Sequence, residues 1–363
     1  MLDVGDTVKG YKIIQEFTTL GGGLSRWTFA EKDGKVFFLK EFLAPKYPKD
    51  DSPGSEKVKA QRRKRCKRFE HHHKALKRAI DTSTSAGGNL VATIDFFRHG
   101  TTYYKVTEKV DISTIKLDDI STLPIERRIL VLKTVAHSLM VLHQLNIVHG
   151  DLKPDNILIK QTKTGDYVAK LIDFDNSYFA KEPPEISDES DIVGDPVYYS
   201  PELGKYIKRD SSISPHDLNT NSDIFTLGII YSQYLTGKLP KFNSKCRYAW
   251  ESANIGNQPS LNGAKLPETL KKLVNNMLDI DSKNRPPIRT VFQTLKNWDK
   301  IEVKKGSGDK PTEPSSGSRL KGKGIVSRGT STKESDSPKS VTPLPSAPTT
   351  SSRLKGKLVE KKK

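Results

Sequence analysis

The strongest constraint on how this chain folds is a pair of short polar motifs placed among apolar, strand-like residues. The first is IVHGDLKPDNILI, residues 147–159, whose polar centre lies between two apolar runs. The second is AKLIDFDNS, in which Asp173 follows another apolar run and stands 22 residues after Asp151. Each motif alone is typical of a polar turn capped by aspartate. Their combination at this separation indicates one chemical site built from two loops.

These motifs contain the side chains that phosphoryl transfer from ATP requires. The reaction needs groups that hold the phosphates, ligands for magnesium, and a carboxylate that orients the attacking hydroxyl and accepts its proton. We expect Asp151 to be that carboxylate and Lys153 to neutralise charge on the transferred phosphoryl group. Asn156, through its amide oxygen, and Asp173 are the predicted ligands for Mg²⁺, with Mn²⁺ as an alternative metal.

The residues before the first motif predict a small β-rich region that contains one long helix. Three aromatic and β-branched runs within residues 8–42 indicate antiparallel strands. Residues 55–80 contain no Gly or Pro, and their apolar side chains recur at helical spacing. The stretch LVATIDFFRHGTTYYKVTEKV, residues 90–110, then supplies two more strands.

Beyond residue 120 the apolar pattern is mostly helical. Pro124 marks the start of a helix whose apolar side chains form one stripe. The segment DIFTLGIIYSQYLTG is apolar almost all round, which predicts a helix buried at the centre of a domain. The predicted fold class is α+β, with a small antiparallel β-rich lobe, a larger helical lobe and a cleft between them.

The last 63 residues differ from the rest of the chain in composition and charge. Residues 301–363 contain no Phe, Tyr or Trp and carry a net charge of +9, half of the total of +18. Such a segment cannot offset its ordering entropy by burial, so we expect it to be disordered. It contains SRLKGK twice, which is either part of a solvated basic tail or a repeated motif that binds a polyanion.

Cysteine content and hydropathy exclude several classes of protein. The two cysteines, Cys66 and Cys246, cannot form a disulfide framework, and no paired Cys/His spacing indicates a zinc site. No window approaches the roughly 18 apolar residues of a membrane span. We therefore expect a cytoplasmic protein without a transmembrane segment.

The sequence resembles the Hanks-type (eukaryotic-like) serine/threonine protein kinase family over about residues 8–298. HGDLKPDN is similar to the catalytic loop of that family and DFD to its metal-binding triplet, which gives the four polar residues named above their family roles. The resemblance implies a kinase domain at 8–300 and a disordered tail at 301–363. The implied parts of the domain are an N-terminal lobe (8–108) with a basic insertion at about 45–65, a hinge (108–112) and a C-terminal lobe (113–300).

The resemblance also implies which groups bind the nucleotide. Lys40 in FFLKEF matches the strand lysine that holds the α- and β-phosphates. LGGGLSRW is similar to the glycine-rich phosphate loop, in which Gly21 and either Gly22 or Gly23 fit the pattern and the third family glycine is missing. A simple hairpin turn is the alternative interpretation of these glycines.

The helix glutamate that would pair with Lys40 is predicted to be Glu70 in CKRFEHHHKAL. It lies 30 residues beyond the lysine, farther than is usual in the family, because the basic insertion intervenes. Glu56 is the alternative partner. Glu70 is also placed to pair with Lys74 on the helix surface.

The stretch YYKVTEKV is similar to the hinge between the lobes of the family. The resemblance implies that Thr107 is the gatekeeper and that the backbones of Glu108 and Val110 bond to adenine. It places Leu158 beneath the adenine ring. An ordinary edge strand is the alternative interpretation.

Two substitutions raise the question of which kind of kinase this is. Gly150 in HGD and Asp175 in DFD are typical of aminoglycoside and choline phosphotransferases, which share the fold. The segment GDPVYYSPE, which contains Glu202, is instead similar to the end of a protein kinase activation segment. In that family Glu202 would pair with Arg285, and Asp223 would hold the catalytic loop. We therefore predict a serine/threonine protein kinase, with a small-molecule phosphotransferase as the alternative.

Two further departures bear on activity. Protein kinases commonly have, at the position of Gly150, an arginine that receives a phosphate on the activation segment. We therefore predict activity that does not require activation-segment phosphorylation. Phe38 replaces a small residue in the roof over adenine, which favours a third hypothesis, a pseudokinase that serves as a nucleotide-binding scaffold.

The predicted partners are protein substrates, whose identity the sequence does not reveal. The many Ser and Thr residues of the tail suggest autophosphorylation. KVKAQRRKRCKR, residues 57–68, holds eight Lys or Arg in twelve positions. It is either a solvated helix face or, with the tail, a contact for nucleic acid or another acidic surface.

Overall fold

The computed structural model describes most of the chain between residues 2 and 298. The described ranges are 2–19, 25–83, 89–110, 115–184, 194–263 and 265–298. The chain divides into two compact units, Met1–Asp309 and Lys310–Lys363, and every described residue belongs to the first. The predicted tail at 301–363 and the predicted loop glycines Gly21, Gly22 and Gly23 lie outside the described residues.

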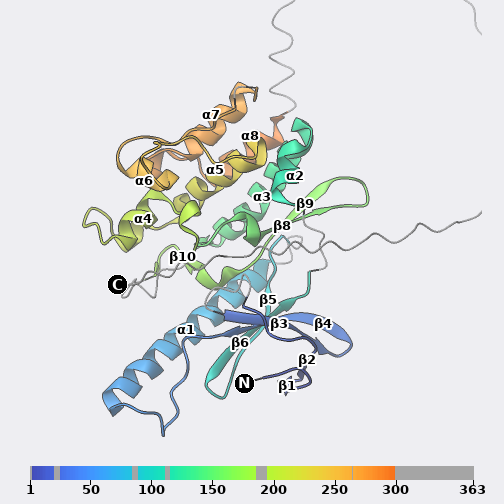
Figure 1. Ribbon diagram of the computed structural model, residues 1–363, viewed down its shortest axis with the longest axis vertical. Coiled ribbons are helices and arrows are strands. Elements are labelled where there is room, and N and C mark those ends of the chain that lie inside the picture. Colours follow the sequence, from blue (N-terminus) through green and yellow to red (C-terminus); the bar gives the residue numbers. More distant parts are fainter. Residues whose placement is uncertain are drawn as a thin grey trace, which may run out of the picture. The chain divides into compact units, whose positions relative to one another are not determined.

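A six-stranded antiparallel sheet forms the N-terminal part of the described chain (Figure 1). Its strands lie in the order β1-β2-β3-β4-β6-β5. The first of the three strands predicted within residues 8–42 is divided in two, because Lys9 and Gly10 both have positive φ and turn the chain. The strands are β1 Thr7–Val8, β2 Tyr11–Ile13, β3 Ser25–Lys32, β4 Lys35–Phe42, β5 Thr93–His99 and β6 Thr102–Glu108.

Helix α1, Glu56–Ser83, packs on this sheet through an aromatic cluster. The Phe69 ring of α1 lies 5.1 Å from that of Phe42 on β4. The imidazole of His73 stacks on Phe96 of β5 with ring centroids 4.7 Å apart. These contacts fix which face of α1 meets the sheet.

The predicted basic insertion at residues 45–65 is half loop and half helix. Residues 56–65 form the first turns of α1, which with 28 residues is about 42 Å long. Most basic side chains in these turns are exposed, including Arg62 and Lys64. They form a solvated helix face, and contact with a polyanion stays a prediction.

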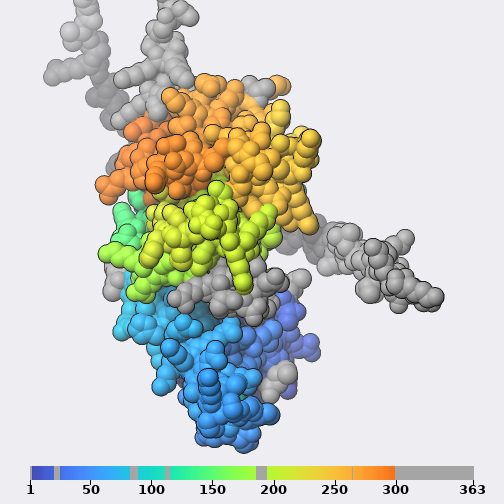
Figure 2. Space-filling view, turned by 90° about the vertical axis from the view of Figure 1, so that its left-hand side faces the viewer, coloured from blue at the N-terminus to red at the C-terminus, as the bar shows by residue number. Residues whose placement is uncertain are grey.

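A mostly helical region follows the sheet, and the predicted α+β fold is confirmed. Helix α5 is buried along nearly its whole length, as its apolar sequence predicted. Helix α3 packs against α8, and α5 packs against α2 and α7. In Figure 2 the blue atoms of the sheet and α1 lie at one end and the orange atoms of α7 and α8 at the other. The helices are α2 Leu117–Thr122, α3 Ile125–Gln144, α4 Pro201–Ile207, α5 Thr220–Thr236, α6 Ala249–Asn254, α7 Glu268–Met277 and α8 Ile288–Lys296.

Two short strand pairs within the helical region carry the polar motifs. Strands β8 and β9 form a hairpin in which Ile157 faces Leu171. Strands β7 and β10 pair antiparallel, with Val148 opposite Tyr178. The strands are β7 Ile147–Val148, β8 Ile157–Gln161, β9 Tyr167–Leu171 and β10 Tyr178–Phe179. Both motifs therefore emerge at the same end of the β8–β9 hairpin.

Among the described residues, the helices lack the combination of length and apolar character that crossing a bilayer requires.

Candidate active site

The catalytic-loop motif folds into a compact network around Asp151. Lys153 Nζ lies 3.1 Å from Asp151 Oδ2. The amide nitrogen of Asn156 donates to the Asp151 carbonyl oxygen at 2.7 Å and to Oδ2 at 3.3 Å. The Asp151 side chain is 8% exposed, so these bonds are protected from solvent. The loop thus brings together three of the four motif residues.

Asp223 of α5 holds the backbone of this loop, as the resemblance implied. Its Oδ2 accepts from the His149 backbone N–H at 2.8 Å, and its Oδ1 accepts from that of Gly150 at 3.3 Å. Oδ2 also lies 2.9 Å from Nε2 of His143. A buried carboxylate with several donors fixes loop geometry more firmly than a neutral acceptor would.

Gly150 is required by the shape of the loop. Its φ is +76°, a conformation that strains residues with a Cβ. A Cβ at this position would overlap the carbonyl oxygen of Asn176 and lie 3.2 Å from the Tyr178 ring. The backbone therefore excludes an arginine here for steric reasons, which the interpretation of Gly150 as a missing regulatory residue did not anticipate.

Asp173 reaches the same region from the end of β9. The backbone N–H of Ile172 donates to the Asn156 carbonyl at 3.0 Å, which ties the two motifs together. Asp173 itself has the left-handed conformation, with φ 60°. This geometry turns its carboxylate away from the direction of the strand and toward Lys40.

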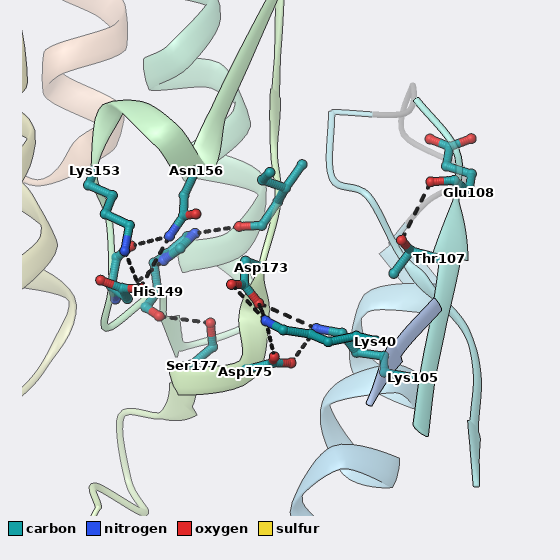
Figure 3. A network of polar contacts seen from close by, with 12 residues as sticks. Lys40, Lys105, Thr107, Glu108, His149, Lys153, Asn156, Asp173, Asp175 and Ser177 are labelled. Carbon is teal, nitrogen blue, oxygen red and sulfur yellow. Dashed lines mark hydrogen bonds and ion pairs between the residues drawn. The ribbon is translucent and has the colours of Figure 1, made fainter. Parts of the chain in front are cut away.

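Lys40 meets two carboxylates rather than one (Figure 3). Its Nζ lies 2.9 Å from Asp173 Oδ1 and 2.6 Å from Asp175 Oδ2. Lys105, which faces Lys40 across the β4–β6 pairing, also contacts Asp175 and lies 3.5 Å from Asp173 Oδ1. The sequence analysis missed the part played by Lys105. The available signal was a lysine between Tyr104 and Val106 in a predicted strand.

Burial and charge oppose each other at these groups. Burial acts to lower the pKa of Lys40, but Asp175 and then Asp173 outweigh it and raise that pKa. Burial likewise acts to raise the pKa of Asp175, yet Lys105 and Lys40 hold it well below its ordinary value. Lys40 and Asp175 are therefore both charged at neutral pH.

The predicted pairing of Lys40 with Glu70 is not what the structure shows. Glu70 Oε1 accepts from the Tyr103 hydroxyl at 2.8 Å, and Oε2 lies 3.5 Å from Lys74 Nζ. The alternative, Glu56, is exposed and pairs with Lys59 on its own helix at 3.2 Å. Glu70 thus meets the sheet at Tyr103 of β6, two residues along that strand from Lys105, and not at Lys40.

His73 is the residue of α1 that approaches the lysines. It is 6% exposed, and burial lowers its pKa well below the ordinary value, assisted by the positive charges of Lys105 and Lys40. The imidazole of His73 is therefore neutral.

The predicted adenine-binding residues lie near the end of β6. Thr107 faces Phe38 across the strand pairing, and Glu108 is the last residue of β6. Glu108 Oε1 pairs with Lys170 Nζ at 2.7 Å, and Lys170 is the strand partner of Leu158. The backbone roles of Glu108 and Val110 stay predictions.

An aromatic group occupies the face of the sheet that carries Lys40. Phe38 and Lys40 are two residues apart on β4 and therefore share this face. The Phe38 ring stacks on Trp27 at 5.2 Å and meets Phe29 edge-on at 6.1 Å. The expected replacement of a small residue by Phe38 is thus part of a larger aromatic cluster.

The predicted end of the activation segment is firmly anchored. Arg285 forms a bidentate pair with Glu202, from Nη1 to Oε1 at 2.7 Å and from Nη2 to Oε2 at 3.0 Å. Gly194, nearer the loop, approaches Asp151 closely enough that a Cβ would lie 3.1 Å from Oδ1. The Trp250 indole N–H donates to the Pro196 carbonyl at 3.0 Å. The segment therefore runs directly past the candidate catalytic carboxylate.

Comparison with known families gives this geometry a context. A family model for the protein kinase domain matches residues 57–295. The chain belongs to the protein kinase family. The match begins within α1, so strands β1 to β4, including Lys40, precede the part of the kinase domain that the model recognises.

Several relatives of this chain are serine/threonine protein kinases by name. A probable serine/threonine-protein kinase of Clostridium perfringens is 26% identical over 73% of the chain and 35% of the relative. A probable serine/threonine-protein kinase of Saccharomyces cerevisiae is 25% identical over 78% of the chain and 44% of the relative. A serine/threonine-protein kinase of Myxococcus xanthus is 32% identical over 42% of the chain and 17% of the relative. The chain thus spans less than half the length of these relatives.

Proposed function

We propose that this chain is a serine/threonine protein kinase that transfers the γ-phosphate of ATP to protein hydroxyls. The observation that carries the proposal is the contact network that joins Asp151, Lys153 and Asn156 and brings Asp173 to Lys40. Asp151 would orient the substrate hydroxyl and accept its proton, and Lys153 would stabilise charge on the transferred group. Lys40 would hold the phosphates of the nucleotide.

The residues present fit a magnesium ion. The amide nitrogen of Asn156 is engaged by Asp151, so its amide oxygen is the atom that remains to face a cation. Asp173 adds a carboxylate, and both groups are hard oxygen donors of the kind that Mg²⁺ prefers. The bound cation would supply charge neutralisation for the phosphates.

Protein substrates are favoured over small molecules by the segment that follows the site. The buried Glu202–Arg285 pair and the Trp250–Pro196 hydrogen bond hold this segment beside Asp151. A rigid segment at that position offers a surface for an extended peptide. Since Gly150 leaves no arginine to receive a phosphate, we propose that activity does not require phosphorylation of the segment.

A nucleotide-binding scaffold without catalysis is the second candidate, favoured by the aromatic cluster. The stacked rings of Phe38 and Trp27 take up room on the face where adenine would be placed. Against this, the residues proposed for phosphate, metal and proton handling are all present in the network described above.

One experiment separates these functions. Wild type and Asp151→Asn are incubated with labelled ATP and Mg²⁺, with generic protein substrates and a panel of small alcohols. Label on protein from wild type alone is the expected result. Label on small molecules only would support the small-molecule alternative, and nucleotide binding without any transfer would support the scaffold.

A further inference from the structure

Four charged side chains, two of them buried and two partly buried, form a cluster at the predicted phosphate-binding lysine. Lys40 comes from β4, Lys105 from β6, and Asp173 and Asp175 from the segment after β9. Exposure of the four side chains ranges from 6% for Lys105 to 27% for Asp173. Two cations meet two anions, so the cluster is electrically balanced without any group from α1.

Asp175 is the carboxylate most closely bound to Lys40. The Lys40–Asp175 distance is 2.6 Å, against 2.9 Å for Lys40–Asp173. Asp175 is also less exposed than Asp173, at 12% against 27%. In the proposed function Asp173 turns to the cation, so Asp175 is the partner that can stay with Lys40 while nucleotide is bound.

We propose that Asp175 and Lys105 are positioning residues that together replace the helix glutamate: Asp175 anchors Lys40 for the nucleotide phosphates, and Lys105 balances the charge of Asp175. The inference rests on the proposed kinase function. Glu70 is excluded from this task because it is committed to Tyr103 and Lys74.

The need for Lys105 follows from the cost of a buried unpaired charge. If Lys105 were apolar, two aspartates would share Lys40 in a mostly buried site. If Asp175 were neutral, two lysines would share Asp173. Either imbalance is unfavourable because the site is largely removed from water. The two residues are therefore expected to depend on each other.

Which residue anchors Lys40 decides which part of the fold controls the position of that lysine. A glutamate on α1 would make the position of Lys40 depend on that helix. Asp175 belongs to the same short segment as Asp173, so one segment sets both the lysine and a metal ligand. His73, which lies on α1 near enough for the lysines to lower its pKa, is neutral and supplies no charge to attract them.

The test compares binding of a Mg²⁺ complex of a non-hydrolysable ATP analogue, together with kcat and KM for ATP, across a set of variants of the full chain. Asp175→Asn is expected to weaken binding by about ten-fold or more, because Lys40 loses its retained anchor. Glu70→Gln is expected to have the smaller effect. Asp166→Asn, in the exposed β8–β9 turn, is the matched control for loss of a carboxylate.

The proposal is overturned if Glu70→Gln weakens binding as much as Asp175→Asn, or if Asp175→Asn behaves like Asp166→Asn. If Asp175→Asn fails to fold, the double variant Asp175→Asn/Lys105→Met takes its place in the test, because it removes one charge of each sign. The expected loss of analogue binding is the same. Asp175→Glu keeps the charge and is expected to restore binding to within a few-fold of wild type.

Failure of the proposed function has a different signature. If folded wild type binds the analogue but transfers no phosphate, the proposed kinase activity is wrong. The comparison of Asp175→Asn with Glu70→Gln in analogue binding then still decides the inference. A folded wild type that binds no nucleotide overturns both.

Discussion

Arg285 and Glu202 are joined by two parallel hydrogen bonds, at 2.7 and 3.0 Å, in a site where the arginine is 3% exposed. Arg285 also donates to the backbone carbonyls of Asp279, Asn221 and Ile280. One side chain thus links the segment beside the active site to α5 and to the turn after α7.

Loss of this link should destabilise the whole helical region. Arg285→Met leaves the Glu202 carboxylate buried and unpaired, which is expected to lower the free energy of unfolding by about 3–5 kcal/mol. Urea denaturation followed by circular dichroism measures the change. Arg289→Met, on the exposed side of α8, is the control and should stay within about 0.5 kcal/mol of wild type. Equal effects of the two substitutions would contradict the structural role given to the pair.

Gly150 can be tested against a second glycine of similar backbone conformation. Gly150 has φ +76° and no room for a Cβ, whereas Gly165 has φ +83° and open space around it. Gly165→Ala should cost about 1–2 kcal/mol for the backbone conformation alone. Gly150→Ala should cost more, because Asn176 must also move. A smaller loss at position 150 in urea denaturation would show that the loop has room for a side chain, and Gly150→Arg would then fold.

Asp223 should affect both stability and rate, because it holds two backbone N–H groups of the catalytic loop. Asp223→Asn is expected to lower the free energy of unfolding by about 1.5–3 kcal/mol, the range for hydrogen bonds to a charged group. Displacement of Asp151 should also lower kcat by about a hundred-fold. Denaturation and steady-state kinetics measure these two effects. The exposed Asp118→Asn on α2 serves as control, and an unchanged kcat in Asp223→Asn would contradict the loop-holding role.

Stability should fall in mild acid because His73 and His149 are buried, and His72 is partly buried, in neutral form. Burial is the main cause that lowers the pKa of His72, His73 and His149 in the folded chain. The unfolded chain therefore binds protons near the ordinary value of 6.5 that the folded chain does not. The stabilisation is complete above that pH and is lost as pH falls below it, by up to about 1.4 kcal/mol per pH unit for each histidine.

Substitution of one histidine measures its share of this acid sensitivity. His73→Phe suits the aromatic surroundings of Phe69 and Phe96 and should flatten the decline of unfolding free energy between about pH 6.5 and 5. His216→Asn, at an exposed position, should leave the decline as in wild type. A pH profile of His73→Phe that matches wild type would show that His73 contributes nothing to it.

The sequence predicted the elements well because their local patterns are strong. Runs of aromatic and β-branched residues identified the strands within residues 8–42, and helical spacing without Gly or Pro identified α1. The pairing of Glu202 with Arg285 also followed from the motifs. These features depend on local pattern or on a resemblance that spans both partners.

The wrong predictions concern which side chains meet when they belong to segments far apart in the sequence. Spacing along the chain does not specify how α1 is rotated about its axis, so it did not show that Glu70 meets Tyr103 rather than Lys40. Nor does it show that Lys105 is buried, since a lysine in a strand is usually exposed. The clash that requires Gly150 involves Asn176, 26 positions away, and depends on the tertiary fold.

The aromatic cluster on the face where the proposed function places the nucleotide has a practical consequence for inhibitor design. The rings of Phe38, Trp27 and Phe29 give a ligand a wide π surface where a small residue would leave an open slot. Bulky heterocycles that fit beneath a small residue should bind poorly, whereas planar ring systems should gain stacking contacts. Selective compounds for this chain should therefore be sought among flat aromatic rings.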